Sequence, residues 1–354
     1  MGRILRRACC WILICIAVQT PLTQKAAAEA VSSDTGASAP AASGTQTVYQ
    51  TISRHVKGTV TLGAGLRFDE FDWNIAGNAA GSNPNILSEL SWSDIESQQL
   101  SLGAKAQVGE HLYGRGHVNY AWIDSGTVRD SDYGGDNRTQ EWSRSICESN
   151  DDELWDVVLG GGYPFTFNQR RWLLAPMLGG SIHKQNLRIT NGRQVLSATP
   201  PPGYDPPPPI GPLNSQLNSL YEARWMSVWS GLDVRYQLAA KADNPPPMEW
   251  GLSLTYHFWG DYQAEANWNL REDLAHPVSF EHEADGSGIG LQAEWLIRVS
   301  RYLNVNLNWN YAQWEADAGD VTVHYSDGGE QLTRLNEVNW DSQSFMVGLA
   351  LRFY

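Results

Sequence analysis

The feature that most constrains this sequence is a strict alternation of apolar and carboxamide side chains near its end. Residues Tyr302 to Trp314 read YLNVNLNWNYAQW, in which odd positions 303 to 311 are apolar and even positions 304 to 310 are all asparagine. Successive side chains of a β-strand point to opposite faces, so the segment predicts a strand with one apolar and one polar face. A soluble sandwich would bury the apolar face, whereas a membrane barrel would turn it toward lipid and the asparagines toward a wet lumen.

The first thirty residues favour the membrane barrel, because they have the layout of a secretory signal peptide. Three arginines precede an apolar run from about Ala8 to Val18, and Ala28-Glu29-Ala30 offers an A-x-A cleavage site. The apolar run is too short to span a bilayer. We therefore expect export, with residues 1–30 as signal peptide, 31–55 as a flexible Ser/Ala/Thr-rich segment and 56–354 as a single domain.

Export also limits what the cysteines can do. Cys9, Cys10 and Cys15 lie in the predicted signal peptide, so the exported chain keeps only Cys147 and lacks an internal disulfide. We expect Cys147 to be unreactive, because an Asp/Glu-rich surrounding would raise the pKa of its thiol.

The net charge of −14, which becomes about −17 once the signal peptide is removed, argues against nucleic acid as a partner. Neither a CxxC pair nor an HExxH motif is present, so no metal is expected.

The C-terminus carries a second alternating segment, SFMVGLALRFY, whose apolar face runs from Phe345 to Phe353. An aromatic-ended last strand of this kind resembles the assembly signal of outer-membrane barrels, and it implies the barrel-assembly machinery as a partner. The 16 tryptophans and 14 tyrosines suit aromatic girdles at the two membrane interfaces. The sequence thus predicts an all-β fold located in the outer membrane.

About ten alternating segments lie between residues 60 and 353, which predicts an antiparallel up-and-down transmembrane β-barrel. Short connections at Gly109-Glu110, Phe167–Arg170 and Ser300–Tyr302 alternate with long ones, and long loops of such barrels face outward. The expected external loops are Asp72–Asn85, Ser125–Asp152, Asn191–Leu220, Glu265–Asp285 and Glu315–Glu337. The third contains a proline-rich stretch, residues 199–212, which would be extended and stiff and acts either as a spacer or as a partner-binding segment.

The second and fourth external loops hold the candidate catalytic residues. Asp130 and Asp132 would be close enough to share a proton and position a water, and Asp273 could orient His276 to take a proton from that water. The alternative is that the D-x-D pair is an Asx-turn or a solvated loop tip. The stretch DSDYGGDN also lacks the spacing of an EF-hand calcium loop.

This layout resembles the omptins, ten-stranded outer-membrane proteases that cleave between basic residues. SELSWS in the second strand, the Asp pair at Asp130 and Asp132, and the pair Asp273 and His276 carry the resemblance. It implies a peptide substrate, lipopolysaccharide as the one candidate cofactor, and outer-membrane lipid and lipopolysaccharide as surroundings. The fourth loop reads D-x-x-H where omptins have D-x-H, and an extra residue displaces the imidazole.

The stretches DSDYGGDNRT, NWNLREDLAHPVSFEH and LNEVNW also resemble the porin-like Protochlamydia outer-membrane protein family. In that reading Trp268, Arg271 and Pro277 brace a loop, and the acidic mouth biases a pore toward small cationic solutes. Three functions stay open: a surface barrel of omptin-like architecture with a non-enzymatic or diverged role, an omptin-type endopeptidase, and a narrow porin or cation-favouring channel. A barrel of about ten strands is too narrow for an open aqueous porin.

Overall fold

The computed structural model describes residues 56–238 and 247–353. The predicted signal peptide and the predicted flexible segment lie outside the described residues. Regular structure in the described part consists of β-strands alone, and none of it is a helix long and apolar enough to cross a membrane. The strands are β1 (Val56–Ile75), β2 (Ser88–Val108), β3 (Leu112–Gly135), β4 (Thr139–Glu148), β5 (Glu153–Gly162), β6 (Phe165–Phe167), β7 (Trp172–Ser197), β8 (Gly211–Pro212), β9 (Ser219–Gln237), β10 (Met248–Asn267), β11 (Phe280–Arg298), β12 (Leu303–Ala316), β13 (Gly319–His324) and β14 (Glu330–Phe353).

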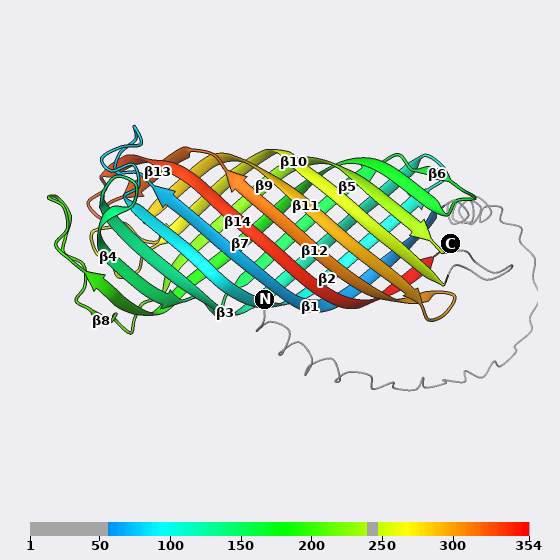
Figure 1. The fold of residues 1–354 in the computed structure, drawn as a ribbon, viewed down its shortest axis with the longest axis horizontal. Coiled ribbons are helices and arrows are strands. Elements are labelled where there is room, and N and C mark those ends of the chain that lie inside the picture. Colours follow the sequence, from blue (N-terminus) through cyan, green and yellow to red (C-terminus); the bar gives the residue numbers. More distant parts are fainter. Residues whose placement is uncertain (1–55, 239–246, 354) are drawn as a thin grey trace, which may run out of the picture. The chain divides into compact units, whose positions relative to one another are not determined.

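Ten of these strands close a ring in the order β1, β2, β3, β5, β7, β9, β10, β11, β12 and β14 (Figure 1). The ring closes because β14 pairs with β1 along nearly its whole length, from Gly58 opposite Phe353 to Ile75 opposite Leu335. Every pairing in it is antiparallel. The antiparallel up-and-down barrel of about ten strands predicted from the sequence is therefore confirmed.

The two ends of the barrel differ in the length of their connections. Short turns lie at one end, where Gly109 and the three residues Asn168 to Arg170 adopt positive φ angles. The strands β4, β8 and β13 and the long connections gather at the other end, on the left of Figure 1. Long loops mark the external end of outer-membrane barrels, so we refer to this end as the external end.

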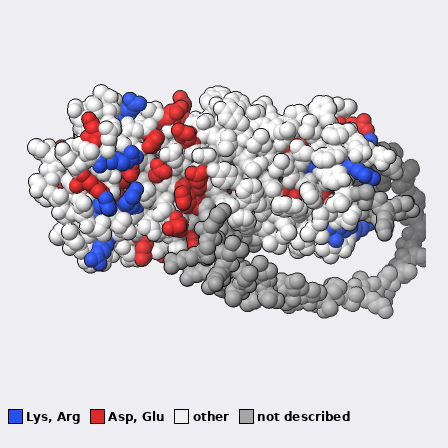
Figure 2. Space-filling view, in the orientation of Figure 1, with Lys and Arg blue, Asp and Glu red and all other residues white. Residues whose placement is uncertain are grey.

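The side chains confirm that the apolar faces of the strands point outward and the polar faces inward. Leu349 and Leu351 on β14 are 53% and 58% exposed, whereas Asn304 and Asn306 on β12 are 2% and 3% exposed. Figure 2 shows an uncharged middle band, with Lys, Arg, Asp and Glu gathered toward the two ends. This arrangement places lipid against the uncharged band and the asparagines in the lumen.

Strands extend into several stretches that the sequence predicts as loops: β11 begins at Phe280, β13 spans Gly319–His324 and β14 begins at Glu330. Residues 125–152 were expected to be an irregular loop, but β3 continues to Gly135 and pairs with β4 to form a projecting hairpin. Asp130 and Asp132 therefore lie on a strand, and the Asx-turn alternative for them is wrong. The polar composition of β4, TQEWSRSICE, hides the strand because it lacks apolar alternation.

Candidate functional site

Asp130 and Asp132 lie two residues apart on β3, so their side chains share one face of the strand. Asp132 lies opposite Ser88 of β2 and Ser143 of β4, and these two side chains lower the pKa of its carboxyl. Burial raises the pKa of each carboxyl above its ordinary value, and the charge of Asp132 raises the pKa of Asp130 further. Two adjacent carboxyls with raised pKa values can share a proton, as the sequence analysis supposed.

Asp273 and His276 lie in the connection between β10 and β11, and their contacts are made with other residues. Both carboxylate oxygens of Asp273 accept hydrogen bonds from Arg271, at 2.8 Å from Nε and 2.7 Å from Nη2. His276 Nδ1 lies 2.8 Å from Oδ1 of Asn267, and its Nε2 lies 3.2 Å from the carbonyl oxygen of Arg271. The structure thus brings Asp273 to a guanidinium, while both ring nitrogens of His276 face protein oxygens.

Arg271 connects the two halves of the candidate site. Its positive charge lowers the pKa of Asp130 and of Asp132 against the effect of burial, and its hydrogen bonds lower the pKa of Asp273. The interaction with Asp273 in turn raises the pKa of Arg271. The sequence predicts for Arg271 only the bracing of a loop. Its nearness to Asp130, some 140 positions away, depends on how the barrel places β3 and the β10–β11 connection, which no local motif encodes.

The neighbouring β4 and the proline-rich segment complete the surroundings of the Asp pair. Tyr204 lies near Asp132, whose charge adds to burial in raising the pKa of the phenol, and its ring is 5.9 Å from that of Trp142. Cys147 is buried on β4, and burial raises the pKa of its thiol to about 11. The increase in the pKa of Cys147 has the direction predicted from the sequence. Its main cause differs from the prediction, because burial contributes more than the carboxylate of Asp130.

Beneath the site, aromatic side chains fill the external half of the lumen. The ring of Trp73 stacks on Tyr221 at 5.7 Å, and the Tyr221 hydroxyl lies 2.8 Å from Nδ1 of His282. Burial lowers the pKa of His282 to about 3, so this imidazole is neutral at physiological pH. His282, which lies in the stretch 265–285 that the sequence predicts as a loop, is instead buried on β11.

Three tryptophans continue this packing toward the membrane. Trp314 stacks on Trp340 with ring centres 6.0 Å apart and an interplanar angle of 16°, and Trp225 lies 5.5 Å from Trp314. All three are at most 2% exposed. We refer to Trp225, Trp314 and Trp340 as the indole plug, because they pack on one another inside the barrel, where Trp314 and Trp340 also line a cavity.

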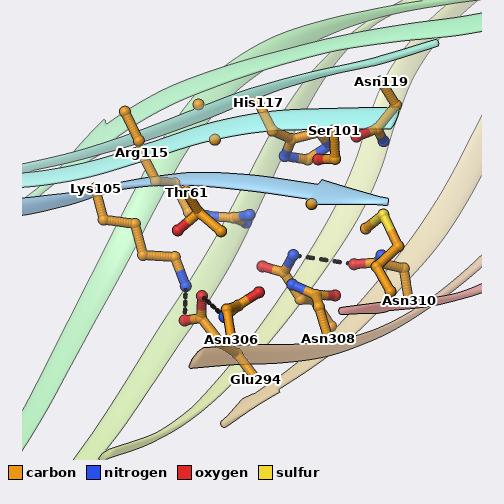
Figure 3. A pocket seen from close by; sticks show the side chains of 16 residues that line it. Thr61, Ser101, Lys105, Arg115, His117, Asn119, Glu294, Asn306, Asn308 and Asn310 are labelled. Atoms are coloured by element: carbon orange, nitrogen blue, oxygen red, sulfur yellow. Dashed lines mark hydrogen bonds and ion pairs between the residues drawn. The ribbon is translucent and has the colours of Figure 1, made fainter. Parts of the chain in front are cut away.

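Below the indole plug, the lumen is polar and nearly filled. Arg67 donates to Asp69 at 2.8 Å and to Asp156 at 2.8 Å, and Asp156 in turn lies 2.9 Å from Nδ1 of His183. Cavities of about 50 and 100 Å³ lie between such groups. Figure 3 shows the smaller one, where Lys105 and Asn306 both hydrogen-bond to Glu294, at 2.6 and 2.9 Å. Two of the lumen-facing asparagines, Asn306 and Asn310, are thus hydrogen-bonded to neighbouring side chains.

A family model and one solved structure agree with this architecture. The model of the family described as Protochlamydia outer membrane protein matches residues 61–353. The outer membrane protease OmpT from Escherichia coli is similar in structure, with a TM-score of 0.67, 12% identity, and coverage of 84% of this chain and 97% of OmpT. The outer membrane protein OprG from Pseudomonas aeruginosa matches with a TM-score of 0.32 and 9% identity over 85% of this chain and 98% of OprG. A search of curated protein sequences gives no match.

Proposed function

The chain belongs to the Protochlamydia outer membrane protein family, and from this premise we propose that it is a non-enzymatic surface barrel. It holds a cap outside the outer membrane, formed by the β3–β4 hairpin and the β7–β9 and β10–β11 connections. The fold is omptin-like, and its location is the outer membrane. At 12% identity the likeness to OmpT concerns the fold alone. The role of this cap therefore depends on the residues at the external end.

The observation that carries the proposal is the pairing of Asp273 with Arg271 in place of His276. A histidine that takes a proton from water needs a ring nitrogen with a free lone pair. Both nitrogens of His276 face protein oxygens, at 2.8 and 3.2 Å. Arg271 binds Asp273 instead, and its charge lowers the pKa of Asp130 and of Asp132 on β3.

The filled lumen supports a surface role over a channel. The indole plug lies across the lumen, and buried ion pairs such as Arg67 with Asp156 lie below it. A permeating cation would have to separate these groups, and breaking a buried ion pair costs several kcal/mol. The narrow-channel alternative therefore requires a rearranged lumen.

Peptide cleavage tests the proposal directly. The refolded barrel, supplied with lipopolysaccharide, would be mixed with fluorogenic dibasic peptides and compared with His276→Ala, Asp130→Asn and an omptin as positive control. We expect background cleavage from the wild type and both variants. Wild-type cleavage that is lost in both variants would overturn the proposal and establish the endopeptidase alternative, with Asp130, Asp132, Asp273 and His276 as its site and a peptide as substrate.

The lipid and assembly partners follow from the same architecture. The uncharged band implies contact with outer-membrane lipid, and we propose lipopolysaccharide as the lipid at the external end. We also propose that β14, with its outward apolar face ending at Phe353, is the strand that the barrel-assembly machinery recognises. Replacing Phe353 with Ser should lower the yield of membrane-inserted barrel while the yield of barrel refolded in detergent stays unchanged.

A further inference from the structure

The proline-rich segment at the external end divides into two runs that the structure treats differently. The first, Pro200 to Pro202, leads into a turn in which the Tyr204 N–H donates to the Pro201 carbonyl at 3.3 Å and Gly203 has a φ of +100°. Pro201 packs against Gly134, where an added Cβ would lie 2.8 Å from the proline ring. The first run is therefore held against the β3–β4 hairpin.

The second run, Pro206 to Pro209 followed by Ile210, stands away from the barrel. Pro206, Pro208, Pro209 and Ile210 are exposed, Ile210 by 63%, and the run belongs to no strand. Four successive prolines fix φ near −65° and lack N–H donors, so the run adopts a polyproline II helix and cannot join a β-ladder. With three residues per turn, Pro206 and Pro209 share one edge, and Pro207 and Ile210 share the next.

Contacts on both sides hold the run in place. On one side the ring of Tyr204 lies 5.9 Å from Trp142, and the Ala198 N–H donates to the Trp142 carbonyl at 2.8 Å. On the other side Gly211 and Pro212 form β8, which pairs with β7, and the Leu213 N–H donates to the Gly192 carbonyl at 2.8 Å. A polyproline II segment fixed at both ends loses little further conformational entropy on binding.

We propose that Pro206 to Ile210 is a docking segment for a protein domain with an aromatic-lined polyproline groove and a basic rim. Exposed polyproline II ridges with P-x-x-P spacing fit between aromatic side chains, which is how SH3, WW and EVH1 domains bind their ligands. The basic rim follows from Asp205, which directly precedes the run, since residues 199–212 contain no Lys or Arg. The segment lies at the external end of the barrel (Figure 1), so the partner acts from outside the membrane. The inference deepens the proposed surface role and rests on it.

The test uses the whole refolded barrel in detergent micelles and two purified probe domains, an EVH1 domain with a basic groove rim and an SH3 domain with an acidic one. We expect calorimetry to detect binding of the EVH1 domain to the wild-type barrel. The affinity of this domain for the Pro206→Ala/Pro209→Ala variant should be about tenfold or more lower. Pro247→Ala, at the opposite end of the barrel, is the matched control and should bind like the wild type. We expect weaker binding of the SH3 domain than of the EVH1 domain.

Three outcomes would overturn the proposal: no EVH1 binding to the wild type, equal binding to the double variant, or the same loss in Pro247→Ala. Equal binding of the SH3 domain would refute the basic rim. A free peptide of residues 199–212 should bind more weakly than the barrel, and equal affinity would refute the role assigned to the anchors. None of these results depends on cleavage or conductance, so failure here is distinguishable from failure of the proposed function.

Discussion

The guanidinium of Arg271 holds both carboxylate oxygens of Asp273 while its charge still acts on Asp130 and Asp132 across the external end of the barrel. Burial disfavours the charged forms of Asp130 and Asp132, and Arg271 offsets part of that cost. The pKa shifts of the three carboxyls therefore have opposite directions: the pKa of Asp273 is lowered, and the pKa values of Asp130 and Asp132 are raised.

This difference predicts opposite pH dependences for two substitutions. The folded protein binds a proton at Asp130 more tightly than the unfolded chain, so wild-type stability falls as pH rises from the ordinary pKa of 3.8 through the raised one. Asp130→Asn lacks this loss, so its stability relative to wild type should increase over that interval and then level off. Urea unfolding of the refolded barrel at a series of pH values measures the difference.

Asp273→Asn is the matched control for that series. Because the folded pKa of Asp273 is lowered, its contribution is present above the ordinary pKa of 3.8 and is lost as pH falls through the folded pKa. The variant should therefore be slightly less stable than wild type at neutral pH, by no more than about 1 kcal/mol because the pair is partly exposed. A pH-independent difference for Asp130→Asn would contradict the burial assigned to that carboxyl.

The thiol of Cys147 should be unreactive in the folded barrel. With a pKa of about 11, its thiolate fraction at pH 8 is roughly two orders of magnitude below that of a free cysteine. Labelling with a thiol reagent should therefore be at least ~100-fold slower in the folded state than in urea. Rapid labelling of the folded barrel would show that β4 opens and exposes the side chain.

Two adjacent glycines on β7 should respond differently to the same substitution. A Cβ added at Gly179 would collide with the ring of Trp229 and the Leu159 carbonyl, whereas one at Gly180 would meet only the Ser227 carbonyl oxygen, at 3.5 Å. Gly179→Ala should lower the free energy of unfolding by about 1–3 kcal/mol and shift the tryptophan emission. Gly180→Ala should leave the free energy of unfolding and the tryptophan emission close to those of the wild type. Equal effects of the two substitutions would refute the packing of Trp229 against Gly179.

The buried ion pairs of the lumen should be sensitive to loss of a single partner. Arg67 is 2% exposed and joins Asp69 to Asp156, so Arg67→Met leaves two carboxylates without their cation. We expect a loss of about 3–5 kcal/mol in the free energy of unfolding. The control, Arg129→Met, removes a guanidinium whose side chain is 49% exposed and should cost about 0–1 kcal/mol. Similar losses in both variants would contradict the buried network.

Alternation predicts the membrane part of this fold because lipid and lumen impose opposite demands on neighbouring residues. That logic identifies β12 and β14 and their inward residues, such as Asn306 and Ser344, from sequence alone. It fails above the membrane, where both faces of a strand tolerate polar side chains, so β4 and the end of β3 stay hidden. Partners such as Arg67 and Asp156, 89 positions apart, become neighbours only once the ring closes. Asp273 contacts Arg271, which is close in sequence, but the path of the loop decides that it contacts Arg271 and not His276.

The indole plug yields a prediction that separates the surface role from the channel alternative. Trp314 and Trp340 line the cavity of about 100 Å³ and stack on each other, so Trp314→Ala/Trp340→Ala would enlarge that cavity. We expect the wild type to show no discrete conductance steps in planar bilayers. Because the cavity grows by two buried indoles, the double variant should also lose at least about 3–5 kcal/mol of unfolding free energy. Trp259→Ala, which changes an indole 70% exposed on the outer face, is the control and should stay closed. Steps of equal size in the wild type and the double variant would mean that ions bypass the plug, and the channel would then be the better description of this barrel.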